Sequence, residues 1–351
     1  LTEGWPAALV LLATAAVRVG GLSVIPAVDD LATPLPRDLC AYLADEVVGS
    51  MEPRLRSFME ESAILDVVTP AACEAILGRQ DAEQILDQLT RTCRLLLVVG
   101  PGAYRYHSLL QRFLLGNLRA RGAEVLNRLS RKCLVPGWLT DPEPGRLSRV
   151  VAQLPPSQKA EYPWMALCEA RYLLSTGQAE RAVGMGPLAL HAFEEAGDRR
   201  GAFYAHLLLS DCLFLRYDFA ASRAELARAA EALLPEFRDD AALLALKRAQ
   251  LAYASGADSE DVEAQLRRAL ALYVESGDLI GEAEVSDRLG FVRIRKGDYR
   301  SGLGLLERSN RMLRSAGVPE HETGMNLAWA YLEVGRFRDS ARLSRPLATS
   351  S

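Results

Sequence analysis

The residue best placed to contact an anion is His107. It follows the alternating segment Ala103–Tyr106 and precedes apolar residues that recur every three or four positions, at Leu109, Leu110, Phe113 and Leu114. This change of period predicts a strand that passes into a helix at His107. The first backbone N–H groups of a helix lack partners within it and favour an anion, so an imidazole at this corner is a candidate for contacting a phosphate. The simpler alternative is that His107 caps the helix or packs in the core.

Other residue patterns that would support nucleotide or metal chemistry are missing from the sequence. None of its four lysines follows a glycine, so there is no Gly-x-x-x-x-Gly-Lys-Ser/Thr segment to hold the β- and γ-phosphates of ATP. We therefore expect no ATP hydrolysis, and no other enzyme activity, from this chain. The four histidines, at positions 107, 191, 206 and 321, are not spaced with cysteines or carboxylates as metal ligands are.

Composition favours a soluble protein of two or three domains. The chain has 351 residues, of which 49% are hydrophobic and 25% charged, and its formal net charge of −4 offers no general attraction for DNA or an anionic membrane. The six cysteines form no Cys-x-x-Cys pair and are expected in the core of a protein from a reducing compartment. The apolar segment from Trp5 to Val17 is too short to cross a bilayer and follows an acid, Glu3. We therefore expect a cytoplasmic protein without a membrane partner.

The residues around His107 resemble those of a known family. The segment Tyr106-His107-x-Leu109-x-x-x-Phe113-Leu114 resembles the winged-helix signature of the STAND signal-transduction ATPases, which include the MalT-like and LuxR-type large bacterial activators. It is also similar to the Met-His-Asp motif of the NB-ARC proteins. Near the start of the chain, Gly4-Trp5-Pro6-Ala7-Ala8-Leu9 resembles the Gly-x-Pro-leucine element of the same families.

This resemblance implies a nucleotide site in the full-length protein. His107 would face the β-phosphate of bound ADP and hold the protein shut, and Pro6 would pack near the adenine. The resemblance thus implies ATP or ADP as a cofactor of the full-length protein, whereas this chain by itself is expected to hold none.

The region around His107 has the element order of a winged helix. Predicted helices up to Arg94 are followed by an apolar β-rich run from Leu95 to Val99, a Gly100-Pro101-Gly102 turn, a second strand and the helix after His107. Winged helices commonly read DNA, and the candidate recognition helix spans 81–94. It carries three acids against two arginines, which disfavours contact with a DNA groove.

Residues after Pro163 repeat with a period of about 40. Small residues recur at intervals of 40, 39, 41 and 38, at Ala170, Ser210, Ala249, Gly290 and Ala328. A turn position follows each after seven residues, at Gly177, Tyr217, Gly256, Gly297 and Gly335, and a third series marks the ends of the second helices at Gly197, Gly277 and Gly317. Three series in phase predict a solenoid of helical hairpins, in which the small residue lets two helices approach closely. The Gly297-Asp298-Tyr299-x-x-Gly302 segment resembles the tetratricopeptide turn, although the standard repeat is about 34 residues long.

The predicted fold is therefore mostly α, with a winged-helix domain followed by a tetratricopeptide-like α-solenoid of about five helical hairpins. We expect residues 1–37 to be the end of a nucleotide-domain helical arm and a linker, 38–121 the winged-helix domain, 122–162 a helical linker and 163–351 the repeat superhelix. The chain starts at Leu1 and stops where a fifth hairpin would need a polar capping helix. We therefore expect a fragment, with a nucleotide-binding half upstream and a DNA-binding domain downstream.

The expected function is that of the sensor and switch region of a STAND-type transcriptional regulator. A small-molecule inducer or a protein effector would bind the repeat superhelix and control the nucleotide state through the winged helix. Self-association is a further expected interaction, and DNA would be bound only through a domain outside this chain. The alternative from another class is a tetratricopeptide-type protein-interaction scaffold without nucleotide switching.

Overall fold

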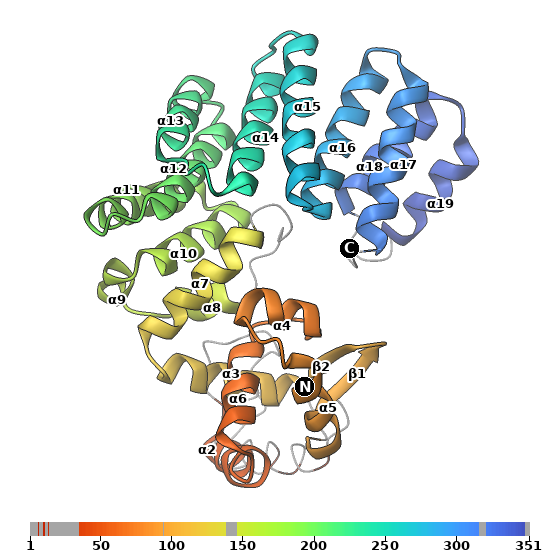
Figure 1. The fold of residues 1–351 in the computed structure, drawn as a ribbon. Helices are drawn as coiled ribbons and strands as arrows, with labels where there is room; N and C mark the ends of the chain where they lie inside the picture. Colours follow the sequence, from red (N-terminus) through yellow and green to blue (C-terminus); the bar gives the residue numbers. More distant parts are fainter. Residues whose placement is uncertain are drawn as a thin grey trace. The chain divides into compact units, whose positions relative to one another are not determined.

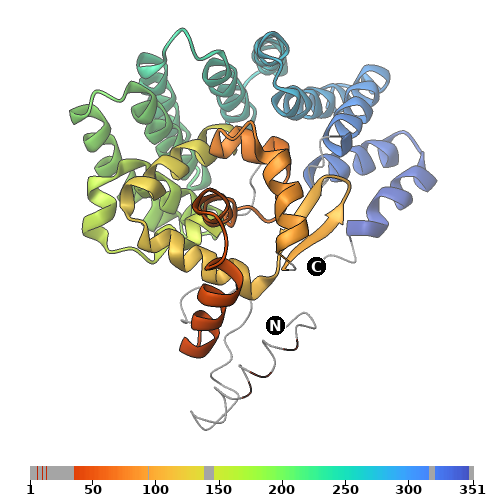
Figure 2. The ribbon, with the colours of Figure 1, turned by 60° about the horizontal axis from the view of Figure 1, so that its bottom comes forward.

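The computed structural model describes residues 35–93, 95–137, 146–315 and 321–347, together with Pro6, Val10 and Ala13 (Figures 1 and 2). The chain forms two compact units. The first comprises residues 1–136 and 143–177, and the second comprises residues 137–142 and 178–351.

The first unit contains a winged helix. Its helices are α2 (Arg37–Tyr42), the π-helical segment η2 (Leu43–Val48), α3 (Pro53–Ser62), α4 (Pro70–Leu77) and α5 (Ala82–Thr92). Helix α4 starts where Thr69 accepts a hydrogen bond from the N–H of Ala72 at 3.1 Å and Pro70 takes the first helical position. It ends at Gly78, whose φ of +69° is left-handed.

The wing is the antiparallel hairpin of β1 (Leu96–Gly100) and β2 (Ala103–Tyr106), and α6 (Ser108–Ala120) follows it. Val68 and Tyr104 exchange two backbone hydrogen bonds of 2.7 and 2.9 Å, which tie the segment before α4 to the hairpin. Tyr106 ends β2 fully buried, and its hydroxyl lies 2.8 Å from the Ser62 hydroxyl. The strand therefore enters the core directly before His107, as the change in sequence period predicts.

Four helices complete the first unit. They are α7 (Ala123–Gly137), α8 (Arg146–Ala152), α9 (Pro156–Glu161) and α10 (Pro163–Ser175). Helix α8 packs on α10, where the Ser148 hydroxyl lies 3.1 Å from the Cys168 sulfur.

Helical hairpins make up the second unit. Its helices are α11 (Ala179–Glu195), α12 (Arg199–Leu215), α13 (Phe219–Ala232), α14 (Arg238–Ala254), α15 (Ser259–Ser276), α16 (Leu279–Arg295), α17 (Tyr299–Ser315), α18 (His321–Glu333) and α19 (Phe337–Leu347). Helix α12 packs on α13, α14 on α15, α16 on α17 and α18 on α19, and each hairpin contacts the next (Figures 1 and 2). Together with α10 and α11, the described helices after Pro163 run along the chain as five pairs, so the predicted fold class is confirmed.

The turns between paired helices use a left-handed residue. The five predicted turn positions have φ of +76° at Gly177, +60° at Tyr217, +76° at Gly256, +85° at Gly297 and +77° at Gly335. Glycine adopts this conformation without strain, whereas Tyr217 must do so with a side chain. The same conformation occurs at Gly197 and Gly277, and Gly317 lies outside the described residues.

Aspartates recur at the helix starts, a pattern that the sequence predictions above did not include. Aspartate side chains accept hydrogen bonds from backbone N–H groups in the first turn of five helices, at Asp198, Asp218, Asp258, Asp278 and Asp298. Each cap satisfies an N–H group that the helix leaves open. The intervals of 20 and 40 residues match the half-period and the full period of the hairpins, so this signal could have been read from the sequence.

The division into compact units differs from the four segments expected from the sequence. The first unit joins the winged helix with α7 to α10, and the second starts at α11 apart from a short internal segment. The boundaries at residues 37, 121 and 162 remain predictions.

Candidate functional site

His107 lies at the junction of β2 and α6 and is buried, with 3% of its surface exposed. Its backbone N–H donates to the carbonyl of Leu95 at 2.7 Å, and its ring nitrogen Nδ1 accepts from the N–H of Leu109 at 3.3 Å. His107 is therefore the N-cap of α6, the simpler of the two roles considered for it. Because Nδ1 accepts, a neutral ring carries its hydrogen on Nε2, the nitrogen that could donate to an oxyanion.

The two residues implied as nucleotide contacts line one cavity. A cavity of about 740 Å³ lies in the first unit and includes Pro6 and His107 among its lining residues. We call it the His107 cavity; its other lining residues are Tyr42, Glu46, Val47, Ser50, Met51, Glu52, Leu55, Gln88, Thr92, Cys93, Leu95 and Leu97. Residues separated by about a hundred positions in the sequence thus meet at one site.

The charge of the His107 cavity opposes a polyphosphate. Among the described residues that line it, the charged ones are Glu46 and Glu52. Like charges repel, so these carboxylates weaken any attraction for nucleotide phosphates. A nucleotide in this cavity therefore needs cations that this set of residues does not supply.

Helix α5, the candidate DNA-recognition helix, has an acidic exposed face. Glu83 and Asp87 are exposed beside Arg91, whereas Ile85 and Leu86 are buried. Asp81, just before the helix, accepts hydrogen bonds from Arg79 and Arg54, which hold the pKa of its carboxyl well below the ordinary value. These two arginines are thus already engaged by a carboxylate.

The five small residues predicted at helix crossings all lie buried. Ala170, Ser210, Ala249 and Ala328 expose 0, 3, 1 and 7% of their surface, and Gly290 is buried on α16. A Cβ atom on Gly290 would lie 2.9 Å from the backbone oxygen of Gly302 and 2.8 Å from Leu306. Helices α16 and α17 therefore approach at a distance that leaves no room for a side chain there.

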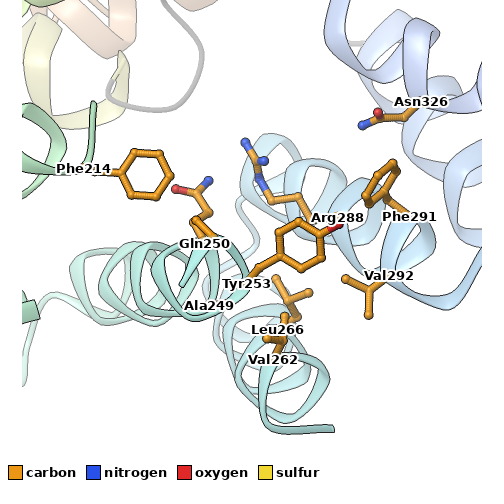
Figure 3. Close-up of a pocket in the computed structure, with 11 residues that line it drawn as sticks. Phe214, Ala249, Gln250, Tyr253, Val262, Leu266, Arg288, Phe291, Val292 and Asn326 are labelled. Atoms are coloured by element: carbon orange, nitrogen blue, oxygen red, sulfur yellow. The ribbon is translucent and has the colours of Figure 1, made fainter. Parts of the chain in front are cut away.

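A second cavity lies among helices of several hairpins (Figure 3). It has a volume of about 350 Å³, and we call it the repeat pocket. Its lining residues come from α12, α14, α15, α16 and α18, and they are Phe214, Ala249, Gln250, Tyr253, Ala254, Val262, Leu266, Arg288, Phe291, Val292 and Asn326. Sequence reasoning did not identify this pocket, because its residues come from several repeats.

Polar side chains connect neighbouring repeats beside the repeat pocket. Lys247 donates to both carboxylate oxygens of Asp211 at 2.8 Å. One repeat further, the Arg288 guanidinium faces the side-chain amide of Gln250. With the amide oxygen and nitrogen exchanged relative to Figure 3, an assignment that satisfies both groups, Nε and Nη2 of Arg288 donate to the Gln250 oxygen at 3.0 and 3.1 Å. Lys247 and Arg288 each lie two residues before the small residue of their own repeat, and Asp211 and Gln250 one residue after it.

Aromatic rings on α14, α16 and α18 lie next to one another beside the repeat pocket. The rings of Tyr253 and Phe291 have centroids 6.2 Å apart, and those of Phe291 and Trp329 are 5.1 Å apart. Edge-to-face and tilted arrangements of this kind are favourable. Tyr253 nevertheless keeps 46% of its surface exposed, so its ring is open to a ligand.

Two further charged clusters lie outside the repeat pocket, the first between neighbouring hairpins and the second within the α12–α13 hairpin. Arg200 donates to both oxygens of the buried Asp240 at 2.8 and 2.9 Å, and the Tyr204 hydroxyl donates to Asp240 at 2.8 Å. His206 lies 2.7 Å from Glu225, which also pairs with Arg228. Burial raises the pKa of Glu225, but His206 and Arg228 outweigh it and hold that pKa below its ordinary value. The Arg200–Asp240 and His206–Glu225 contacts bridge helices and are structural in role.

The described part of the chain offers no metal centre or membrane span. No group of three or more His, Cys, Asp or Glu side chains among the described residues could hold a metal ion. Burial raises the pKa of Cys73 and Cys212 to about 12, so these thiols stay protonated. No described helix has both the length and the apolarity needed to cross a bilayer.

Comparison with protein families identifies the first domain. Residues 44–126 match the MalT winged helix domain. This part of the chain is thus similar to the MalT winged helix domain, in agreement with the resemblance of the residues around His107. The matched region includes His107 and the whole β1–β2 hairpin. No curated protein matches the sequence.

Several solved structures resemble the fold at low sequence identity. One is a Signal Transduction ATPase with Numerous Domains (STAND) protein with a tetratricopeptide repeat sensor from Pyrococcus horikoshii, with 14% identity and a TM-score of 0.49 over 99% of this chain. This chain spans 57% of the length of that protein. Another is a Rap protein complexed with Competence and Sporulation Factor, with 13% identity and a TM-score of 0.48 over 79% of this chain and 71% of that one.

Proposed function

We propose that the chain is the sensor and switch region of a STAND-type transcriptional regulator. The observation that carries the proposal is a MalT-type winged helix at residues 44–126 followed along the chain by helical repeats that contain a ligand-sized pocket. In this account the repeats bind a small-molecule inducer or protein effector. The winged helix then couples that binding to control of the nucleotide state. DNA is bound through a domain outside this chain.

The nucleotide part of the proposal is supported by the geometry at His107. His107 and Pro6 line one cavity, and the N-cap contact at Nδ1 places the imidazole hydrogen on Nε2 of the neutral ring. One hydrogen bond to a charged phosphate contributes about 1.5–3 kcal/mol, which changes ADP retention about tenfold or more. The cations that balance the phosphates would come from a nucleotide-binding part of the full-length protein.

A tetratricopeptide-type interaction scaffold without nucleotide switching is the second candidate. The charge of the His107 cavity favours it, because Glu46 and Glu52 are the charged residues among the described lining. In a scaffold, His107 would act only as the N-cap of α6.

The nucleotide content of the natural full-length protein distinguishes these functions. The switch predicts about one ADP per protein molecule after purification without added nucleotide, released slowly from the folded protein and completely on denaturation. The scaffold predicts none. This chain, purified alone, is the matched control, because both proposals expect it to carry no nucleotide. A full-length protein that is free of nucleotide and fails to bind added ADP would contradict the switch.

A further inference from the structure

The repeat pocket has the size of a small-molecule site. Its volume of about 350 Å³ lies in the range of pockets that enclose drug-sized ligands, about 300–1,000 Å³. Its floor is apolar, with Val262, Leu266 and Val292 beneath the rings of Tyr253 and Phe291 (Figure 3). Flat rings pack well against aromatic side chains, so an aromatic group fits this lining.

The charge of the pocket selects an anion. Among the described residues that line the pocket, Arg288 is the charged one and none is acidic. Figure 3 shows the Arg288 guanidinium extending from α16 beside Gln250 and Tyr253. The carboxylate of Glu284 lies 3.7 Å from Arg288, beyond hydrogen-bonding distance, and does not line the pocket. A ligand carboxylate can therefore bind Arg288 without displacing a strong ion pair.

The amides of the pocket are oriented by their neighbours. Gln250 uses its oxygen to accept from Arg288, which leaves its NH₂ group to donate. Asn326 donates from Nδ2 to Asp287 at 2.6 Å, which leaves its oxygen as an acceptor. The pocket thus presents donors from Arg288 and Gln250 and an acceptor from Asn326. This arrangement fits a carboxylate together with a second polar group.

We propose that the repeat pocket binds a small aromatic carboxylate. The carboxylate accepts hydrogen bonds from Arg288 and the Gln250 amide, and the ring packs against Tyr253 and Phe291. The regulatory meaning of this site rests on the proposed sensor function, but the binding itself does not. If no ligand binds the repeat pocket, the ADP measurement on the full-length protein is unaffected. If the full-length protein holds no ADP, the ligand-binding test on this chain is equally unaffected.

The test uses the whole 351-residue chain and a panel of aromatic carboxylates, each paired with its neutral primary amide. The panel spans phenyl, naphthyl and indolyl acetates, and dissociation constants are measured by ligand-observed NMR. We expect at least one carboxylate to bind about tenfold or more tightly than its amide, the effect of a hydrogen bond to a charged group. Cyclohexyl analogues should bind more weakly than phenyl ones, because they lack the flat ring.

Three substitutions locate the site. Arg288→Gln should remove the preference for the carboxylate over the amide, and Arg288→Lys should keep part of it, since the charge remains but the forked donor is lost. Arg295→Gln is the matched control, because Arg295 is exposed on the same helix and does not line the pocket. Circular dichroism melting checks that each variant is folded.

The proposal is overturned if no carboxylate in the panel is preferred over its amide. It is also overturned if the preference survives in Arg288→Gln.

Discussion

Tyr217 adopts a left-handed backbone conformation that is unfavourable for a residue with a side chain. It occupies the turn position that glycine fills in the other repeats, with φ of +60° and 82% of its surface exposed. A side chain in this conformation costs roughly 1–2 kcal/mol, and asparagine tolerates it better than tyrosine.

We therefore expect Tyr217→Asn to raise the free energy of unfolding by about 0.5–1 kcal/mol. The gain is reduced by loss of the ring contact with Phe219, at 6.2 Å between centroids. Gly256→Ala is the opposite change at the equivalent turn, where φ is +76°. It should lower the free energy of unfolding by about 1–2 kcal/mol. Urea denaturation followed by circular dichroism measures both. A lower stability for Tyr217→Asn would contradict the account of this turn.

Glu225 should make stability depend on pH. Its pKa is lower in the folded protein than its ordinary value, so its contribution is present above the unfolded pKa and is lost as pH falls through the folded pKa. We expect the free energy of unfolding to fall on acidification below about pH 5 as Glu225 takes up a proton.

Glu225→Gln should be less stable than the natural chain at pH 7, because it loses the carboxylate that contacts His206 and pairs with Arg228. The difference in the free energy of unfolding between the two proteins should shrink towards pH 3. Urea denaturation at several pH values between 7 and 3 measures it. A constant difference across this range would show that Glu225 is not stabilised as an anion.

At the scale of elements, close helix packing at Gly290 is the feature most open to test. Gly290→Leu places a branched side chain where even Cβ meets the backbone of Gly302 at 2.9 Å. Overpacking of this kind costs about 1–3 kcal/mol. Gly304→Leu on α17 is the matched control, because nothing lies within 4 Å of a Cβ there and the helix gains from losing a glycine. Equal melting temperatures for the two variants would contradict the proposed register of the crossing.

Local signals explain which elements the sequence predicts. The hairpin around Gly100-Pro101-Gly102, the strand-to-helix change at His107 and the turn glycines depend on backbone preferences of a few adjacent residues, so the sequence carries them. The helix break after α13 is likewise signalled by Pro235, and Leu233 adopts an extended conformation at the end of that helix.

Contacts between repeats could not be predicted in the same way. The Arg200–Asp240 pair joins residues 40 positions apart, and the repeat pocket draws its lining from several repeats. Their partners are determined by how hairpins pack, which the period alone does not specify. The acidic lining of the His107 cavity was missed for the same reason, because Glu46 and Glu52 meet His107 only in the folded winged helix.

At the scale of the whole molecule, the chain alone should neither hydrolyse ATP nor bind duplex DNA with sequence specificity. The sequence has no phosphate-binding Gly-x-x-x-x-Gly-Lys segment, and the exposed face of α5 carries Glu83 and Asp87 against Arg91. Phosphate release should stay at the level of a buffer control, and operator-like duplexes should show no sequence-dependent shift at moderate salt. Either activity, with contaminating enzymes excluded, would contradict this expectation.

The central claim, that His107 links the winged helix to a nucleotide, is tested most directly by the rate of ADP dissociation from the natural full-length protein. His107→Asn is the informative change, because asparagine is a good N-cap and keeps α6 intact while removing the imidazole Nε2. His191→Asn is the control, since His191 is exposed on α11 and pairs with the neighbouring Glu195. The account predicts ADP dissociation about tenfold faster or more in His107→Asn than in the natural protein and the control. A folded His107→Asn protein that releases ADP at the natural rate would contradict it.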